Sequence, residues 1–250
     1  MAIARVTRER FFLLNPPFDR KILRDYYCCT FSKAGYLWHP IDLLVQSGIL
    51  GERGPVAVLD AVAQRASHKS VVRTAIDFSP TLVFCLVGSL SIETDSIILK
   101  EIKEKTGAMI VVSGDACLEN PEEFLNDREY IDATLFDFTS RDILRLAAGD
   151  FEGVDSSAFR KCGKIIARRK RKRKEFSYPI PDHGVFERDS YKMPLVPSEF
   201  KTVLASFGCP YSCAFCNSGD SSLGFSFRNH EDLMEEIASL YSRGSRHVFF

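Results

Sequence analysis

The chain has 250 residues, with 33 basic and 33 acidic side chains and a formal net charge of zero. Hydrophobic residues make up 45% and charged residues 26%, which excludes a disordered, collagen-like or disulfide-stapled protein. No apolar run approaches the roughly 20 residues that cross a bilayer, and Pro16-Pro17 soon interrupts the N-terminal apolar stretch. We therefore expect a cytoplasmic protein without a transmembrane segment, whose eight cysteines are reduced thiols.

Residues 1–150 alternate continuous apolar runs with amphipathic stretches. Continuous runs are typical of strands that are buried on both faces. The expected strands are Phe11–Asn15, Val56–Asp60, Thr81–Val87, Met109–Ser113 and Ile131–Phe138. The first expected helix starts at Pro40 and ends at Gly48, the second is capped by Ser67, and the third is capped by Thr94 and ends at Gly107. A short helix opens at Asn120-Pro121, and the last runs over Arg141–Ala148. Five such units predict an α/β fold, a flavodoxin-like doubly wound parallel sheet.

A sheet of that order binds ligands beyond the carboxyl ends of its strands, where the strand order reverses. The candidate binding residues in the loops there are Asn15, Ser89, Ser91, Thr94, Gly114 and Asp115. Hydroxyls and backbone N–H groups at helix starts can bind phosphate or amide groups, although the same residue types also serve as caps and turns. The sequence has no G-x-G-x-x-G and no Walker-type loop, which disfavours ordinary nucleotide binding.

Residues 151–198 have the proline and charge content of a connector. The segment Arg160–Glu175 contains ten basic residues and one acidic residue, whereas the rest of the chain has 23 basic and 32 acidic residues. Such a run is either a nucleic-acid or nuclear-localisation patch or a solvated hairpin tip, with Lys164–Ala167 as one arm. No aromatic residue interrupts Arg168–Lys174, so we expect no nucleic-acid partner.

Three cysteines with C-x3-C-x2-C spacing, Cys209, Cys213 and Cys216, follow an expected strand over Lys201–Ser206. Thiolates ligate iron–sulfur clusters, and three ligands leave one iron of a cubane open. A structural zinc site would need a fourth ligand close by, and the next histidine is His230. An iron–sulfur cluster is therefore favoured over zinc.

A helix capped by Asn229 and ended by Gly244 comes next, followed by an expected strand over His247–Phe250. Strand, cluster loop, helix and strand are the opening of a (β/α) barrel. We assign residues 199–250 to the start of this second domain.

The segment Cys209–Cys216, with Phe215 before the last cysteine, resembles the radical S-adenosylmethionine (SAM) superfamily. The stretches FFLLNPP, VAVLDAVA, TLVFCLVGSLSIETD and MIVVSGDACLENPEEF look like the cobalamin-binding domain of one large subgroup. The whole chain therefore resembles the N-terminal portion of a cobalamin-dependent radical SAM enzyme.

The resemblance implies three cofactors: a 4Fe-4S cluster on Cys209, Cys213 and Cys216, SAM on its free iron, and cobalamin. Phe215 is implied to line the cluster and the SAM adenine, and the six loop residues named above to contact cobalamin. In the family, electron transfer cleaves SAM to a 5′-deoxyadenosyl radical, and cobalamin often carries a methyl group. The implied partners are a reductant such as flavodoxin or ferredoxin and an unidentified small-molecule or lipid-like substrate. The alternative function is a cobalamin-binding or sensor module without turnover.

The chain departs from many cobalamin proteins because it lacks the D-x-H-x-x-G motif that supplies a cobalt ligand. His39 precedes the first expected helix and is a candidate substitute, although a cap or interface role is favoured. The remaining cysteines, Cys28, Cys29, Cys85, Cys117 and Cys162, are expected to be ordinary thiols.

A complete barrel takes about 250 residues, whereas the barrel-like segment here is residues 199–250. We therefore expect a truncated chain with an incomplete barrel, an aggregation-prone sheet edge and negligible turnover by itself.

Overall fold

The computed structural model describes residues 9–33, 35–169, 174–186, 191, 199–211, 213–214 and 224–250. Its centre is a seven-stranded, mostly parallel sheet in the order β4-β1-β5-β6-β7-β8-β9. The strands are β1 (Phe11–Asn15), β4 (Val56–Asp60), β5 (Leu82–Leu86), β6 (Met109–Ser113), β7 (Ala133–Leu135), β8 (Ser156–Lys161) and β9 (Lys164–Arg169). The first five are parallel, and the hairpin β8–β9 extends the sheet in antiparallel pairing.

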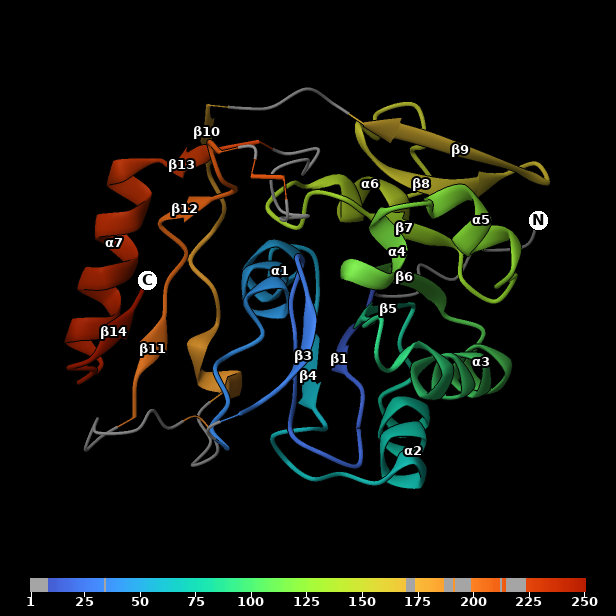
Figure 1. Cartoon of the computed structure of the whole chain (residues 1–250), viewed down its shortest axis with the longest axis horizontal. Helices are drawn as coiled ribbons and strands as arrows, with labels where there is room; N and C mark the ends of the chain where they lie inside the picture. The colour runs from blue at the N-terminus through green and yellow to red at the C-terminus, as the bar shows by residue number, and fades with distance from the viewer. Residues whose placement is uncertain are drawn as a thin grey trace, which may run out of the picture.

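Helices cover both faces of this sheet (Figure 1). Side chains of α1 (Ile41–Gly51) and α6 (Asp142–Ala147) pack into the core of one face. The other face buries side chains of α2 (His68–Phe78), α3 (Ile92–Thr106), α4 (Asp115–Leu118) and α5 (Pro121–Asn126). Adjacent strand residues such as Leu13 and Leu14 belong to opposite cores, which is why the strands read as continuous apolar runs.

Two smaller sheets of C-terminal elements lie beside α1, on the side away from α2 and α3 (Figure 1). β10 (Glu175–Phe176) and β12 (Ser206–Phe207) flank β13 (Ser226–Arg228), and β11 (Lys201–Thr202) pairs in parallel with β14 (Val248–Phe249). A short hairpin joins β2 (Ile22–Arg24) to β3 (Cys29–Phe31). The helical segments here are η1 (His183–Phe186) and α7 (His230–Ser242).

The predicted β1, β4 and β6 have the observed bounds, and Ser67, Gly107 and Asn229 cap their helices as expected. Thr94 does not cap α3: the helix begins at Ile92 after Ser91, and the Thr94 hydroxyl donates to the Ser91 carbonyl.

Three expected boundaries were also wrong. α1 continues past Gly48 to Gly51. Gly48 does not end the helix but lets it pack against the carbonyl groups of Pro179 and Ile180, where a side chain would collide. The fifth strand contains only Ala133–Leu135. The expected strand Lys201–Ser206 is divided between β11 and β12, which join different sheets.

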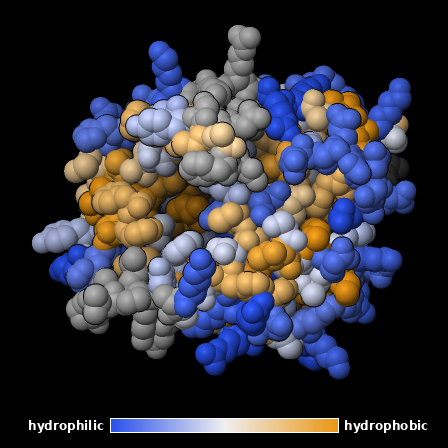
Figure 2. Space-filling view, in the orientation of Figure 1, coloured by the Kyte–Doolittle hydropathy of each residue, from blue (hydrophilic) through white to orange (hydrophobic). Residues whose placement is uncertain are grey.

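Apolar side chains gather over the C-terminal elements on the face shown in Figure 2, where they border a hollow. The large apolar side chains exposed within residues 224–250 are Phe225, Phe227, Met234, Tyr241, Phe249 and Phe250. Among the described residues, no helix is both long enough and apolar enough to span a membrane.

Candidate cofactor site

The predicted binding residues lie at the carboxyl edge of the central sheet. Asn15 ends β1, Ser89 and Ser91 follow β5, and Gly114 and Asp115 follow β6. The parallel register of the three strands brings these loops to one edge. Thr94 lies in the first turn of α3 at the same edge.

Arg24, from the β2–β3 hairpin, closes the crevice between β1 and β5. Its side chain has no exposed surface and forms a 2.9 Å ion pair with Asp95, which is equally buried. The guanidinium also donates to the Asn15 side chain at 2.8 Å and to the Ser91 hydroxyl at 3.0 Å. Asn15 and Ser91, both buried, are thus engaged by the chain itself.

Asp115 ties the same hairpin to the neighbouring loop. Its carboxylate accepts the backbone N–H and the hydroxyl of Ser89, at 2.9 and 2.7 Å, and the backbone N–H of Cys29 at 2.9 Å. Ser89 is exposed and Asp115 is half-buried. These two residues therefore form the outer rim of the edge, where a ligand can reach them.

Carboxyl groups beneath this rim are withdrawn from water, which raises their pKa values. Burial raises the pKa of Asp42, on α1, to about 8, and the nearby Asp25 carboxylate adds to the effect. Burial also raises the pKa of Asp25, against the hydrogen bonds from the backbone of Cys28 and Tyr27. Desolvation raises the pKa of Asp95 as well, although the Arg24 guanidinium opposes it. Asp42 therefore holds a proton at neutral pH.

His39 is enclosed and cannot reach this rim. Its ring stacks on Tyr191 at 4.2 Å, meets Phe186 and Phe200 edge-on, and hydrogen-bonds through Nδ1 to the Thr202 hydroxyl at 3.1 Å. Burial and the positive charge of Lys201 lower its pKa to about 3. These contacts join the start of α1 to β11, so they match the interface role better than cobalt ligation.

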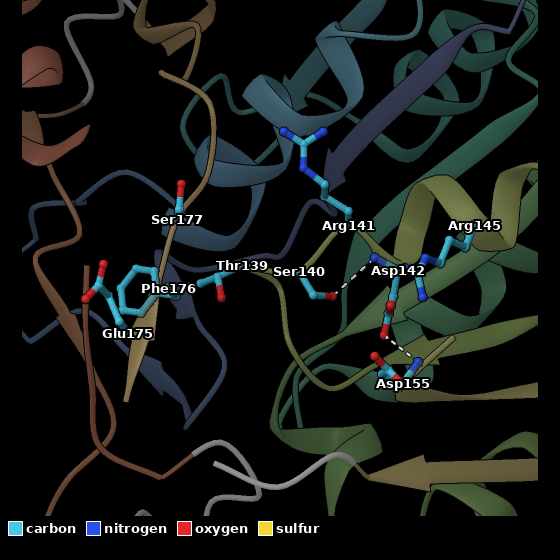
Figure 3. Close-up of a pocket in the computed structure, with 9 residues that line it drawn as sticks. All are labelled: Thr139, Ser140, Arg141, Asp142, Arg145, Asp155, Glu175, Phe176 and Ser177. Atoms are coloured by element: carbon cyan, nitrogen blue, oxygen red, sulfur yellow. Dashed lines mark hydrogen bonds between the residues drawn. The ribbon is translucent and has the colours of Figure 1, made fainter. Parts of the chain in front are cut away.

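An open pocket of about 450 Å³ lies farther along the same edge (Figure 3). One wall is the loop after β7, from Thr139 to Asp142, and the other is β10 with Ser177. Asp142 accepts the backbone N–H groups of Asp155 and Ser156 at 3.1 and 2.7 Å. The pocket carries hydroxyls and charges of both signs, and its volume suits part of a large ligand rather than a whole cobalamin.

The cysteine segment leaves the pair β12–β13, which is antiparallel. Gly208 has a φ of +88°, and a side chain there would collide with the Gly224 carbonyl, so the two ends of the loop can meet only at a glycine. Cys209 is half-buried and Cys213 is exposed, and neither forms a disulfide. Phe215 and Cys216 lie outside the described residues. Within the described part of the chain, no group of three or more candidate side chains is placed to hold a metal ion.

The other five cysteines are free thiols, of which Cys29, Cys85 and Cys117 are buried and Cys28 and Cys162 are exposed.

In the basic run, the described guanidinium groups bind the chain's own carbonyls. Arg168 donates to Phe151, Glu152 and Val154 at 2.8–3.1 Å, and Arg169 donates to Leu118 at 2.6 Å. Residues 170–173 lie outside the described residues. The expected absence of a nucleic-acid partner stays a prediction.

Sequence reasoning missed Arg24 and Asp95, which hold the crevice shut. A basic residue between two short apolar stretches gives no signal of burial, because arginine is almost never fully buried unless it is paired. Asp95 lies in the first turn of α3, where an acidic residue is ordinary.

Comparison with known proteins found one informative sequence relative. It is the protein described as uncharacterized methyltransferase PH0819 from Pyrococcus horikoshii, 24% identical over 254 residues. The match covers 96% of this chain and 52% of the relative, so this chain spans about half of that protein. No protein-family model matches the sequence.

Solved structures of similar fold include OxsB, described as a cobalamin-dependent S-adenosylmethionine radical enzyme. Its aqua-cobalamin complex matches with a TM-score of 0.68 at 15% identity, over 95% of this chain and 32% of OxsB. The apo form matches with a TM-score of 0.66 at 16% identity. The resemblance to cobalamin-dependent radical SAM enzymes is thus confirmed as a likeness of fold, and the similar proteins are enzymes by description.

Proposed function

We propose that this chain forms the cofactor-binding half of a cobalamin-dependent radical SAM enzyme. Its flavodoxin-like sheet would carry cobalamin, and residues 199–250 would begin the barrel that holds the cluster. The observation that carries the proposal is the position of the cysteine segment. Phe207, two residues before Cys209, packs at 4.9 Å against Phe138, in the loop that follows β7 at the carboxyl edge of the sheet. The C-x3-C-x2-C segment therefore starts beside the edge where cobalamin is expected.

The residues present fit both groups. Cys209 and Cys213 are accessible thiols without a covalent partner, as cluster ligands must be. At the sheet edge, the exposed Ser89 and the half-buried Asp115 present a hydroxyl and a carboxylate where a ligand can reach them. Groups of this kind can hydrogen-bond the amide side chains of a corrin ring. When bound, the cluster would supply the electron that cleaves SAM, and cobalamin would carry a methyl group.

The chain's own residues would have distinct tasks. Cys209, Cys213 and Cys216 would hold the cluster, with Phe215 against SAM. Ser89 and Asp115 would meet cobalamin at the rim, and the buried Asn15, Ser91 and Gly114 would support the loops behind it. Thr94, whose hydroxyl donates to the Ser91 carbonyl, would hold the first turn of α3 beside them. The PH0819 relative makes methyl transfer the favoured reaction class. A flavodoxin- or ferredoxin-like reductant in the cytoplasm would supply the electron.

Anaerobic reconstitution with iron and sulfide tests the proposal. The full chain should bind about four irons, and SAM should shift the electron paramagnetic resonance (EPR) spectrum of the reduced cluster. A triple Cys209→Ala, Cys213→Ala, Cys216→Ala variant should lose this iron, whereas Cys162→Ala, which removes an exposed thiol elsewhere, should keep it. Equal iron in the wild type and the triple variant would overturn the cluster assignment. Cobalamin binding without cluster iron would instead indicate the binding module.

A further inference from the structure

Phe207 is enclosed by three aromatic rings from distant parts of the chain. It stacks on Tyr27 at 5.1 Å with 24° between the ring planes. It meets Tyr26 and Phe138 edge-on, at 5.1 and 4.9 Å. Tyr26 also contacts Tyr27 and Phe138, so the four rings form one closed group, which we call the aromatic joint. Only 6% of the Phe207 surface is exposed.

The two tyrosines are fixed to the carboxyl edge of the central sheet. They lie between β2 and β3, where Asp25 accepts the backbone N–H groups of Tyr27 and Cys28 at 2.8 and 2.9 Å. Arg24 on one side of this turn binds the loop after β5, and Cys29 on the other side binds Asp115. The hairpin therefore moves with the loops that are expected to meet cobalamin.

Phe207 is equally fixed to the cysteine segment. It precedes Gly208 and Cys209 directly, and it pairs with Ser226 across β12–β13. The base of the loop is anchored further by a buried network on β13 and α7, where Glu236 binds Arg228 and, at 2.6 Å, His183. A shift of the Phe207 ring would therefore carry Cys209 with it.

From these contacts we infer that Phe207 is a positioning residue. Its packing against Tyr26, Tyr27 and Phe138 sets the distance between the cluster and cobalamin. The inference rests on the proposed function. Aromatic rings pack in preferred edge-to-face and stacked orientations, so four mutually packed rings fix their relative positions. Aliphatic side chains of the same size have no such preferred orientation. A group held this way transmits the position of one loop to another across a packed interior.

The separation of the two cofactors is measurable, because the reduced cluster and cob(II)alamin are both paramagnetic. The cluster speeds relaxation of the cob(II)alamin EPR signal, and this effect falls steeply with distance. The full chain loaded with both cofactors should show the enhancement. Phe207→Ala and the milder Tyr27→Leu should keep wild-type iron content and cobalamin affinity but lose the relaxation enhancement. The matched control Phe227→Ala removes an exposed ring from the same strand pair and should keep it.

Wild-type relaxation enhancement in both joint variants would overturn the inference. Failure of the wild type to bind iron or cobalamin would overturn the proposed function instead, and amide hydrogen exchange on the cofactor-free chain then decides whether the joint exists. Phe207→Ala should accelerate exchange in the β2–β3 hairpin as well as in β12 and β13. Acceleration confined to β12 and β13 would show that the hairpin is not held by Phe207.

Discussion

The guanidinium of Arg24 and the carboxylate of Asp95 form a 2.9 Å ion pair from which water is wholly excluded. The two residues are 71 positions apart in the sequence. One belongs to a hairpin that follows β1 and the other to the helix that follows β5, so the pair bridges the point where the strand order reverses. In a doubly wound sheet this is the place where a ligand crevice is expected, and here it is filled by protein.

Removing one charge of this pair should destabilise the fold strongly. Arg24→Met or Asp95→Leu leaves the partner buried without a counter-ion, which costs about 3–5 kcal/mol. The double variant Arg24→Met, Asp95→Leu should cost less than the sum of the single variants, because no isolated charge remains. Urea unfolding of the four proteins in a double-mutant cycle measures the coupling.

Arg73 and Asp77 on α2 are the matched control, because their ion pair is exposed and 3.6 Å long. Substituting either residue should change the free energy of unfolding by no more than about 0.5 kcal/mol. Additive costs at Arg24 and Asp95 would contradict the assignment of a coupled buried pair.

The central strands could be predicted because their signal is local. Phe11–Asn15 and Met109–Ser113 are apolar at every position but the last, and only a strand buried on both faces needs that pattern. The β2–β3 hairpin has no such signal. Its strands are three residues long, and its stability comes from Arg24 and Cys29, whose partners lie in loops far along the chain.

The candidate site was predictable in part for the same reason. The loops that hold Ser89 and Asp115 follow directly from the strand ends. The burial of Asn15 and Ser91 beneath Arg24 depends on tertiary contacts that no local pattern encodes. Likewise, the spacing of the cysteines is a local pattern that predicts a cluster. The packing of Phe207 against three rings could not be predicted, because those rings come from segments distant in the sequence.

Asp42 should make the stability of the fold depend on pH. Its pKa is about 8 in the folded chain, against 3.8 ordinarily, so between these values the folded state holds a proton that the unfolded state has lost. The contribution of Asp42 is therefore fully present below about pH 4 and is lost as the pH rises to 8, on the order of 1 kcal/mol per pH unit.

Asp42→Asn isolates this contribution. The difference in unfolding free energy between the wild type and Asp42→Asn, measured by urea unfolding from pH 4 to pH 9, should shift in favour of the variant until about pH 8 and then level off. A flat difference over this range would instead show that the Asp42 carboxyl group is ionised in the folded chain.

The cysteines should separate into reactive and inert groups when the iron-free chain is alkylated with iodoacetamide. Cys209 and Cys213 are accessible and should react, whereas Cys85 and Cys117 are fully buried, with raised pKa values, and should not. Cys28 is exposed, but desolvation and the nearby Asp25 carboxylate raise its pKa to about 11, so it should react slowly at pH 8.

Mass spectrometry of the digested protein measures each rate. Reconstitution with iron and sulfide should then protect Cys209 and Cys213 but leave the exposed Cys162 as reactive as before. Equal protection of Cys162 would mean that precipitation or oxidation, and not cluster assembly, blocks the thiols.

His39 should behave as a neutral packing residue. Its pKa is about 3 in the folded chain, so between pH 3 and 6.5 only the unfolded chain binds the proton, and stability is lost as the pH falls through this range. His39→Gln should therefore lose less stability between pH 7 and pH 4 than the wild type does.

Because the ring is enclosed by Tyr191, Phe186 and Phe200, His39→Ala should leave the absorption spectrum of bound cobalamin unchanged. Loss of a histidine-ligated cobalt spectrum in that variant would mean that His39 leaves its aromatic enclosure to bind the metal.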